Sequence, residues 1–451
     1  MGRLFGTDGV RGIANEFLSC ELATSIGRAL GNVLSSNGKY RPKVIIGMDT
    51  RLSSEMLASA ISAGLCSVGS DVVTLGVVPT PAVAYLVKKY NAKAGVMISA
   101  SHNPYEYNGI KVFSEEGFKL SDELEEQIES IVLDNTPPIK LASSEQIGKR
   151  YDAPEALDDY INYLMSTTNV RFDGMKIAID CSNGSASATA EKLFCGLGAD
   201  AYLISDKPDG ININENCGST HIGALKKYVV ENKLDAGIAF DGDADRCLAV
   251  DENGNEVDGD FIMAMLALDM KKKGVLNKNT VVGTIMTNFG FQKFCEKNEI
   301  NFIAAKVGDR YVLEIMNQEG YSFGGEQSGH VIIRQHATTG DGQLTALALI
   351  SHIKESGKTL GELASVMKKY PQHMVNIKTT PNGKIAFFTD EDIKAILHEA
   401  EETIGVTGRL VVRPSGTEPL IRVMVEGEDA EKTVLIAEDV AEKIAKKLSE
   451  Y

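Results

Sequence analysis

The fold is decided by the stretch GVMISASHNP, which occupies Gly95–Pro104 and is followed by NGIK at Asn108–Lys111. Its first half is a continuous apolar run, Gly95–Ile98, which predicts a buried strand. Its second half is rich in Ser, Asn and Pro, which predicts a loop that presents the Ser101 hydroxyl at the end of that strand. Ser and Asn in such a turn often only cap backbone groups. The stretch alone therefore leaves a structural and a functional interpretation open.

Three segments share one plan: an apolar run, a polar turn, an amphipathic helix and a second apolar run. The first spans 44–75, with a helix expected at about 53–68, and the second spans 177–204, with a helix expected at about 186–194. The third spans 281–305. Strand–helix–strand units predict mixed or parallel sheets with helices on both faces, so we expect three related α/β domains.

The sequence after Tyr370 follows another pattern, with short alternating strands and long polar helices. It predicts a small α+β domain built from strands at 373–377, 409–412 and 420–425 and from helices at 391–403 and 430–448. The predicted fold class is thus α/β, with three related mixed-sheet α/β domains plus a smaller C-terminal α+β domain. The expected domains are 1–155, 156–254, 255–369 and 370–451.

The amino-acid composition disfavours some classes of binding partner. The chain has 46 Lys and Arg against 62 Asp and Glu, a formal net charge of −16, which argues against nucleic acid or an anionic membrane as the main partner. An anionic small substrate would need local basic groups. The seven cysteines are scattered without C-x-x-C spacing, and no signal peptide or transmembrane run is visible, so we expect a cytoplasmic protein.

The second polar loop is DGDADR at Asp241–Arg246. Three carboxylates, those of Asp241, Asp243 and Asp245, stand at alternate positions and can converge on one cation. Mg²⁺ suits them because it takes oxygen ligands and often shares its shell with a substrate phosphate. An EF-hand is excluded because Arg246 occupies the position where that loop needs Gly. A plain turn is disfavoured because clustered carboxylates repel one another without a cation.

Two further polar loops follow. GGEQSGH at Gly324–His330 offers groups that can bond sugar hydroxyls, although by itself it also fits a plain hairpin turn. RPSGTEP at Arg413–Pro419, with Arg422 beyond it, combines small residues that expose backbone N–H groups with hydroxyls and guanidinium groups. This composition favours phosphate binding, and an ordinary strand–loop–strand connection is the alternative.

With these four loops in this order, the chain resembles the α-D-phosphohexomutases over essentially its whole length, and no signature position departs from that family's pattern. The opening FGTDGVRG at Phe5–Gly12 and the variant GEQSGH most resemble the members that interconvert glucosamine 6-phosphate and glucosamine 1-phosphate. The resemblance implies four domains around a central cleft, each supplying one loop. It also implies a sugar-phosphate substrate and a glucosamine 1,6-bisphosphate intermediate.

The resemblance further implies roles for individual residues. Ser101 would carry a phosphoryl group, and Mg²⁺ would be held by Ser101, Asp241, Asp243 and Asp245. Arg11 and Lys111 would flank the phosphoserine, and Lys111 and His330 are the candidates for proton transfer. The expected substrate contacts are His102, Arg246, Glu326, Ser328, Arg413, Ser415, Gly416, Thr417 and Arg422.

The expected partner is a small-molecule sugar phosphate, with no nucleic acid and no membrane, and a homodimer is left open. Two other functions stay open as well. One is a related mutase that acts on glucose or mannose phosphates. The other is a non-catalytic sugar-phosphate sensor, which the presence of Ser101 and all three aspartates disfavours.

Overall fold

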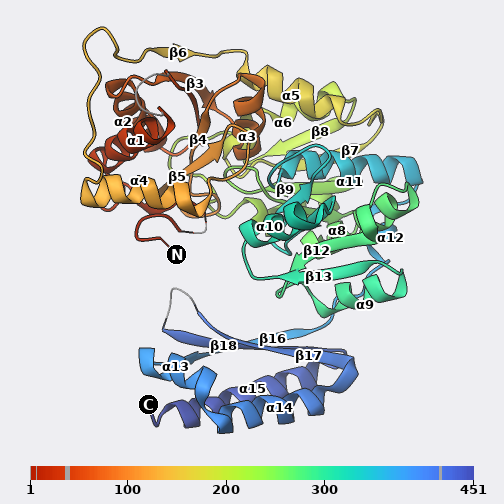
Figure 1. Cartoon of the computed structure of the whole chain (residues 1–451). Helices are drawn as coiled ribbons and strands as arrows, with labels where there is room; N and C mark the ends of the chain where they lie inside the picture. The colour runs from red at the N-terminus through yellow and green to blue at the C-terminus, as the bar shows by residue number, and fades with distance from the viewer. Residues whose placement is uncertain (1, 7, 36–40, 416–418) are drawn as a thin grey trace. The chain divides into compact units, whose positions relative to one another are not determined.

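Four sheets organise the chain in the computed structural model (Figure 1), which describes residues 2–6, 8–35, 41–415 and 419–451. The chain divides into two compact units. The first unit comprises Met1–Thr284 and Ile303–Ser365, and the second comprises Ile285–Phe302 and Val366–Tyr451.

The first sheet has the strand order β1-β5-β4-β2-β3-β6. Its strands are β1 (Val10–Ile13), β5 (Tyr107–Ser114), β4 (Ala94–Ile98), β2 (Lys43–Met48), β3 (Asp71–Val77) and β6 (Arg150–Asp152). The pairs β4–β2, β2–β3 and β3–β6 are parallel, whereas β5 pairs antiparallel with β4 and with β1. The helices of this part are α1 (Cys20–Leu34), α2 (Ser54–Ser67), α3 (Thr80–Lys89) and α4 (Asp122–Asp134).

The strand predicted at Gly95–Ile98 lies within β4, at the centre of this sheet. Every residue of β4 is buried, as expected for a strand covered on both faces. Strands β2 and β4 are parallel neighbours, so the loops that follow them meet at one edge of the sheet. These loops carry Asp49–Arg51 and Ser99–Pro104.

The second sheet has the order β11-β10-β9-β7-β8. It contains β11 (Glu256–Val257), β10 (Cys247–Asp251), β9 (Ala236–Phe240), β7 (Lys176–Asp180) and β8 (Asp200–Ile204), with helices α5 (Ala156–Ser166), α6 (Ala190–Gly196) and α7 (Gly223–Asn232). Strands β9 and β10 are antiparallel, and their connection is the acidic loop. The helix expected at 186–194 is a 3₁₀ turn followed by α6. The hydroxyls of Ser187 and Thr189 donate back to the carbonyls of Gly184 and Ala186, which interrupts a continuous helix.

The third sheet has the order β13-β12-β14-β15. It contains β13 (Asn301–Ala305), β12 (Thr280–Thr284), β14 (Phe323–Gly325) and β15 (Val331–Ile333). Helices α8 (Gly259–Lys272), α9 (Phe289–Lys297), α10 (Asp309–Glu319), α11 (Gly342–Ser356) and α12 (Leu360–Ala364) belong to this part of the sequence. The loop at Glu326–His330 connects the antiparallel strands β14 and β15, as a hairpin.

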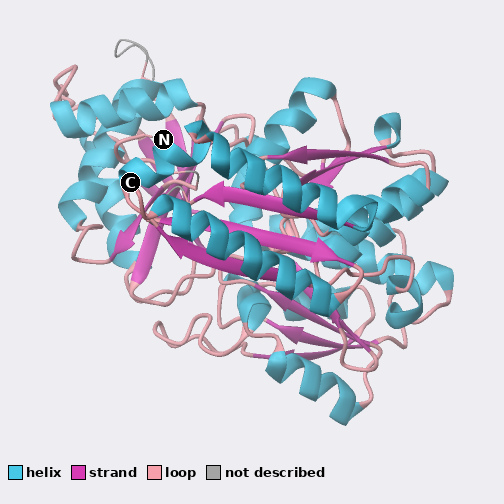
Figure 2. Ribbon diagram, turned by 90° about the horizontal axis from the view of Figure 1, so that it is seen from below, coloured by secondary structure: helices cyan, strands magenta, loops and turns pink. Residues whose placement is uncertain are grey.

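The second unit contains an antiparallel sheet, β16-β18-β17, with β16 (Gln372–Lys378), β18 (Leu420–Gly427) and β17 (Gly408–Pro414). Helices α14 (Glu391–Ile404) and α15 (Ala430–Leu448) pack on this sheet (Figure 2), and α13 (Pro381–Thr389) precedes them. Segment 285–302 is tied to this unit by the fully buried carboxylate of Glu426, which accepts hydrogen bonds from Phe289 N and Asn288 Nδ2.

The predicted fold class is confirmed: three mixed α/β sheets precede a smaller C-terminal α+β domain. The sequence analysis did not predict α13, because its sequence PNGKIAFFT has Pro381 and Gly383 in the first turn and lacks an amphipathic period.

Candidate active site

Ser101 occupies a tight turn just beyond β4. Its φ is +54°, in the left-handed region, and its side chain is buried between loops rather than presented to solvent. The Oγ hydroxyl donates to Oδ2 of Asp241 at 2.6 Å. The hydroxyl of Ser101 therefore contacts the acidic loop directly.

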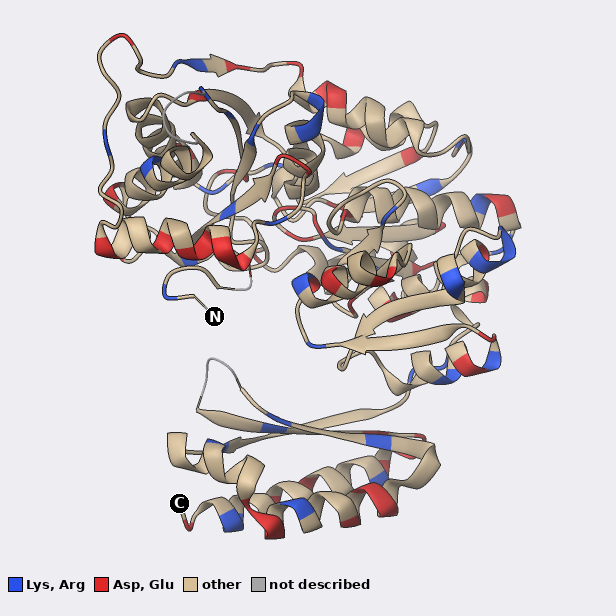
Figure 3. Cartoon of the chain, viewed as in Figure 1, with Lys and Arg blue, Asp and Glu red and all other residues tan. Residues whose placement is uncertain are grey.

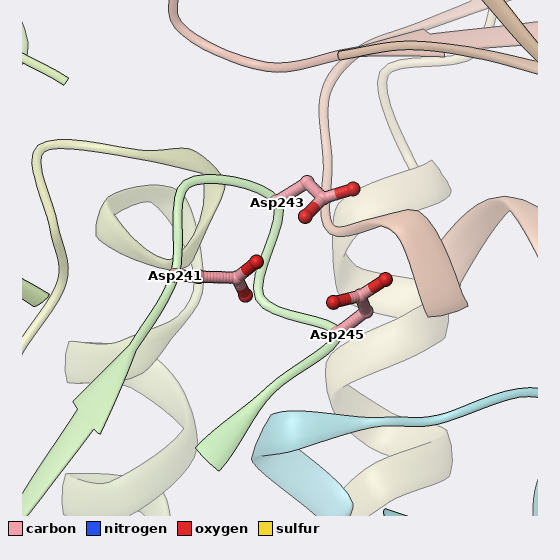
Figure 4. A group of neighbouring side chains, drawn as sticks. All are labelled: Asp241, Asp243 and Asp245. Atoms are coloured by element: carbon pink, nitrogen blue, oxygen red, sulfur yellow. The ribbon is translucent and has the colours of Figure 1, made fainter. Parts of the chain in front are cut away.

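The acidic loop brings the three aspartates together (Figure 4). One carboxylate oxygen from each of Asp241, Asp243 and Asp245 lies within 4.8 Å of the others, and all three residues are buried. Ala244, with φ +57°, gives the tight turn that lets alternate side chains converge. Oδ1 of Asp243 and Oδ1 of Asp245 are buried without a hydrogen-bond partner among the described residues. This buried triad is able to bind a metal ion, because unsatisfied carboxylate oxygens are the donors that a hard cation requires.

Burial and the neighbouring charges shift the pKa values of two triad carboxylates in opposite directions. Burial and the carboxylates of Asp245 and Asp243 raise the pKa of Asp241 well above its usual range. Burial also disfavours the charge of Asp245, but Lys111 and His330 outweigh this effect and hold its pKa below the usual range. The raised pKa of Asp241 reflects its burial beside two further carboxylates, and a bound divalent cation would favour its charged form.

Lys111, on β5, reaches this loop from the first sheet. Its buried Nζ lies 2.7 Å from Oδ2 of Asp243, 3.1 Å from Oδ2 of Asp8 and 3.7 Å from Oδ2 of Asp245. Burial opposes the ammonium charge, but the three carboxylates outweigh it and raise the pKa of Lys111 above its ordinary value. Arg11 also pairs with Asp8, so Arg11 and Lys111 share one carboxylate.

A second buried lysine extends this network. Nζ of Lys119 lies 2.6 Å from Oδ1 of Asp8 and 2.6 Å from Oδ2 of Asp309, and Asp309 Oδ2 lies 3.5 Å from Nε2 of His330. The sequence analysis missed Lys119 and Asp309, since no motif marks them. Asp8 lay within the quoted FGTDGVRG but received no role.

His330 is buried between two carboxylates. Nδ1 lies 3.6 Å from Oδ2 of Asp245, and burial is outweighed by Asp245 and Asp309, which raise the pKa of His330 to about 9. The backbone N–H of Gly340 donates to Nε2 at 3.0 Å. A proton on both ring nitrogens therefore requires this contact with Gly340 to open.

The remaining predicted contacts of the first unit lie around the same loops. His102 Nδ1 is 3.5 Å from Ser101 Oγ, and burial and the charges of Arg246 and Arg11 lower the pKa of His102 to about 4. Nε of Arg246 lies 4.0 Å from Asp241 Oδ2.

The hairpin between β14 and β15 presents two of the predicted sugar contacts. Oε1 of Glu326 accepts from Gly308 N at 3.0 Å, and the charge of Glu326 helps to raise the pKa of Arg246 against burial. Oγ of Ser328 is buried without a hydrogen-bond partner among the described residues. An unsatisfied hydroxyl beside a carboxylate can receive the hydroxyl groups of a sugar.

The fourth predicted loop lies in the second unit. Arg413 on β17 and Arg422 on β18 are direct cross-strand partners. Burial and the charge of Arg422 lower the pKa of Arg413. Nζ of Lys384, on α13, donates to the carbonyl of Ser415 at 2.6 Å, so a third cation approaches this loop. Gly416 and Thr417, which the sequence analysis also assigned here, lie outside the described residues.

None of the helices in the described ranges has the length and apolar character needed to cross a bilayer.

Family models match the chain in four consecutive pieces. The α/β/α domains I, II and III of phosphoglucomutase/phosphomannomutase match residues 2–138, 158–254 and 258–370, and the C-terminal domain matches residues 374–443. A curated relative, the phosphoglucosamine mutase of Acetivibrio thermocellus, is 54% identical over 429 residues, which cover 95% of this chain and 96% of the relative. The chain belongs to the phosphoglucomutase/phosphomannomutase family.

Solved structures of this family share the fold. A phosphoglucomutase/phosphomannomutase family protein from Burkholderia thailandensis is 20% identical, with a TM-score of 0.84, and the match covers 99% of this chain and 97% of that chain. The N-acetylphosphoglucosamine mutase of Aspergillus fumigatus, solved with GlcNAc-6P and magnesium, is 16% identical, with a TM-score of 0.66 over 99% of this chain and 96% of that chain.

Proposed function

We propose that this member of the family is a phosphoglucosamine mutase, an isomerase that interconverts glucosamine 6-phosphate and glucosamine 1-phosphate and supplies amino-sugar precursors of the cell wall. The observation that carries the chemistry is the hydroxyl of Ser101, held 2.6 Å from a carboxylate of the buried aspartate triad. The choice of sugar is supported by the relative from Acetivibrio thermocellus, which bears that name and is similar over nearly its whole length.

In this proposal Ser101 carries the phosphoryl group. The bond from phosphorus to Ser101 Oγ breaks as a bond to a sugar hydroxyl oxygen forms, and the hydroxyl proton passes to a base. Glucosamine 1,6-bisphosphate then turns over. Its other phosphoryl group returns to Ser101 Oγ, and an acid protonates the sugar oxygen that is released. In-line transfer of this kind depends mainly on positioning and on neutralised charge.

The proposed metal is Mg²⁺, with Ser101, Asp241, Asp243 and Asp245 as the residues that would hold it. Bound Mg²⁺ would neutralise charge on the phosphoryl group during transfer. The buried, unpartnered oxygens of Asp243 and Asp245 support this assignment. The N-acetylphosphoglucosamine mutase of Aspergillus fumigatus, solved with GlcNAc-6P and magnesium, is consistent with the same choice.

Lys111 and His330 are the proposed proton carriers, and Arg11 is proposed to hold phosphate beside Ser101. The carboxylates around Lys111 keep its ammonium protonated, which suits the acid role. The pKa of His330, raised against burial to about 9 by Asp245 and Asp309, favours the imidazolium near neutral pH, and Nε2 can carry a proton only when the contact from Gly340 opens.

Substrate binding is proposed to divide between two loops. Glu326 and Ser328 would grip ring hydroxyls, with His102 and Arg246 beside the reacting phosphate. Arg413, Ser415, Gly416, Thr417 and Arg422 would hold the other phosphate, and we add Lys384 because its ammonium contacts Ser415. Arg413 and Arg422 lie opposite each other on neighbouring strands, and a phosphate bound between two such guanidinium groups would offset their repulsion.

The domain limits 1–155, 156–254, 255–369 and 370–451, a cytoplasmic location, the absence of nucleic-acid and membrane partners, and a homodimer are kept as proposals. The four family-model matches fall within those limits apart from a single residue at 370.

A coupled assay for glucosamine 1-phosphate, run beside glucose and mannose phosphates, tests the proposed activity. We expect the highest kcat/KM for glucosamine phosphate and measurable side activity on glucose phosphate, because one amine-for-hydroxyl difference is worth only a few kcal/mol, on the order of 10–200-fold. A higher kcat/KM for glucose or mannose 1-phosphate would contradict the proposed substrate but would still identify the protein as a sugar-phosphate mutase. No turnover of any sugar phosphate would favour the sensor.

A further inference from the structure

Arg51 is a buried residue whose guanidinium donates hydrogen bonds to the Ser101 loop. Its Nε donates to Oδ2 of Asp49 at 2.7 Å, and its guanidinium is buried. The other two nitrogens donate to three carbonyls of the loop, those of Ser101 (2.9 Å), Asn103 (2.8 Å) and Pro104, and to the carbonyl of Tyr107 (3.0 Å) at the start of β5. All five donors of the guanidinium are therefore used, three of them on the backbone of the loop.

Asp49 reaches the same loop by a second route. Its Oδ2 accepts from Ser99 Oγ at 2.6 Å, and Ser99 Oγ accepts from the backbone N–H of Ser101 at 3.0 Å. Arg51 thus fixes the carbonyl of Ser101, and Asp49 fixes its N–H through Ser99. Both peptide groups around Ser101 are held while its φ is +54°, a conformation that non-glycine residues rarely adopt.

The loop is also held from the second sheet. Nδ2 of Asn214 donates to the carbonyls of Ser101 at 2.9 Å and Asn103 at 3.0 Å. The Oδ1 atom of Asn214 accepts from Ser182 Oγ at 2.7 Å. Gly242, within the acidic loop, packs so closely that a Cβ there would lie 2.6 Å from Ser101 O. One carbonyl therefore meets Arg51, Asn214 and the acidic loop.

The segment that carries Arg51 makes two more contacts with the second sheet's loops. Thr50 Oγ1 donates to Asn183 O at 2.6 Å, and Leu52 N donates to Gly210 O at 2.8 Å. The turn after β2 thus connects the Ser101 loop to the part of the chain that carries the triad.

We infer that Arg51 is a positioning residue for phosphoryl transfer: with Asn214 it fixes Ser101 Oγ relative to the aspartate triad. The inference rests on the proposed role of Ser101 as the phosphoryl carrier. Reacting atoms must be held in a near-attack geometry, and a misplacement of about 1 Å costs on the order of 100-fold in rate. Removal of the hydrogen bonds that Arg51 and Asn214 donate should therefore reduce the rate of phosphoryl transfer and leave the contacts with the sugar intact.

Arg51→Lys is the decisive variant. A lysine keeps a positive charge beside Asp49, but its three donors on a single nitrogen cannot replace the planar fork that spans four carbonyls. We expect kcat per folded molecule to fall on the order of 100-fold, with KM for the sugar phosphate within about threefold of the parent value. The rate at which the bisphosphate phosphorylates Ser101, followed by intact mass, should fall by the same factor.

Asn214→Ala gives a second, milder variant in case Arg51→Lys folds poorly, with an expected loss of kcat of about tenfold. Asp251→Ala is the matched control. Asp251 is a buried carboxylate that holds a turn by accepting from Asn253 N and Asn255 N, and it lies at the end of β10 away from the acidic loop. This control should lose stability but keep the parent kcat per folded molecule.

Parent-like kcat in folded Arg51→Lys or Asn214→Ala, or a loss confined to KM, would overturn the inference. An equal loss of kcat in Asp251→Ala would do so too, because the effect would then be general destabilisation. Turnover by the parent enzyme is measured in the same assay. An inactive parent enzyme would contradict the proposed function and remove the premise of this inference. An active parent together with fully active Arg51→Lys and Asn214→Ala variants would contradict the inference alone.

Discussion

The Ser101 loop and the connection between β17 and β18 that contains Ser415, here called the Ser415 loop, differ in how their described charged residues are arranged. Around Ser101, Lys111 faces three carboxylates, and the buried Arg51 pairs with Asp49. At the Ser415 loop, Arg413 faces Arg422 across two strands and Lys384 approaches as well. The first loop is assembled around charges of both signs that fix a reacting group. At the second, the described residues Arg413, Arg422 and Lys384 bring cations together, an arrangement that suits an anionic ligand.

The contrast is local to the two loops. On the outer helices α14 and α15, Lys and acidic residues are interspersed (Figure 3), and pairs such as Lys443–Asp439 and Lys447–Asp392 form. The opposed arginines are therefore not a general property of the C-terminal domain. We expect changes at the first loop to affect turnover and changes at the second to affect substrate requirement.

The largest effect is expected for Ser101→Ala. Removal of the phosphoryl-accepting oxygen should reduce kcat by at least about 10³-fold, because no second acceptor stands at that position. Ser99→Ala should be milder, since Ser99 only relays a hydrogen bond to Asp49. Steady-state kinetics and peptide mapping of phosphate on Ser101 check both. Full activity of Ser101→Ala would remove the reacting role from this loop.

The second-largest effect on turnover is expected when the metal is removed. Chelation with EDTA should abolish turnover and added Mg²⁺ should restore it, and Asp243→Asn should lower turnover by about 10²-fold and weaken the dependence on metal. The reason is that Asp243 keeps a buried oxygen without a partner. Activity that survives rigorous chelation would show that the triad only balances Lys111.

Arg413→Ala should change KM more than kcat. A charged hydrogen bond to phosphate is worth about 1.5–3 kcal/mol, so KM should rise on the order of 10–100-fold, and bisphosphate should escape from the enzyme during turnover. The control is Lys443→Ala, an exposed cation of α15. Unchanged KM together with no leakage of bisphosphate would separate the Ser415 loop from substrate binding.

The smallest effect concerns stability without ligand. Like charges directly opposite each other on neighbouring strands cost about 0.2–1 kcal/mol. Arg413→Gln should therefore slow amide hydrogen exchange in β17 and β18 slightly when no anion is present. Inorganic phosphate should slow exchange there in the parent and have little effect in the variant. Faster exchange in Arg413→Gln without phosphate would mean that the arginine pair stabilises this sheet.

Much of this contrast was visible in the sequence, because each loop is a short motif of unusual composition. The strand before Ser101 was predicted from a continuous apolar run and lies within β4, and the strand expected at 420–425 lies within β18. The helices expected at 391–403 and 430–448 are α14 and α15. Local pattern is sufficient where the structure is determined by residues near in sequence.

The partners that hold these loops could not be predicted in the same way. Asn214 is 113 residues from Ser101, and Asp309 is 190 residues from Lys119. Nothing in the spacing of such residues shows that folding brings them together. Arg51 is the exception. It follows β2, the parallel neighbour of β4, and the loops after neighbouring parallel strands meet at one edge.

Transfer of a labelled phosphoryl group tests the proposed reacting role of the Ser101 loop most directly. Enzyme that carries labelled phosphate on Ser101 is mixed with unlabelled glucosamine 6-phosphate and quenched within a single turnover. The account predicts that the label leaves the Ser101 peptide and appears in the sugar bisphosphate at a rate no slower than kcat. Label that stays on Ser101 while glucosamine 1-phosphate forms would contradict it.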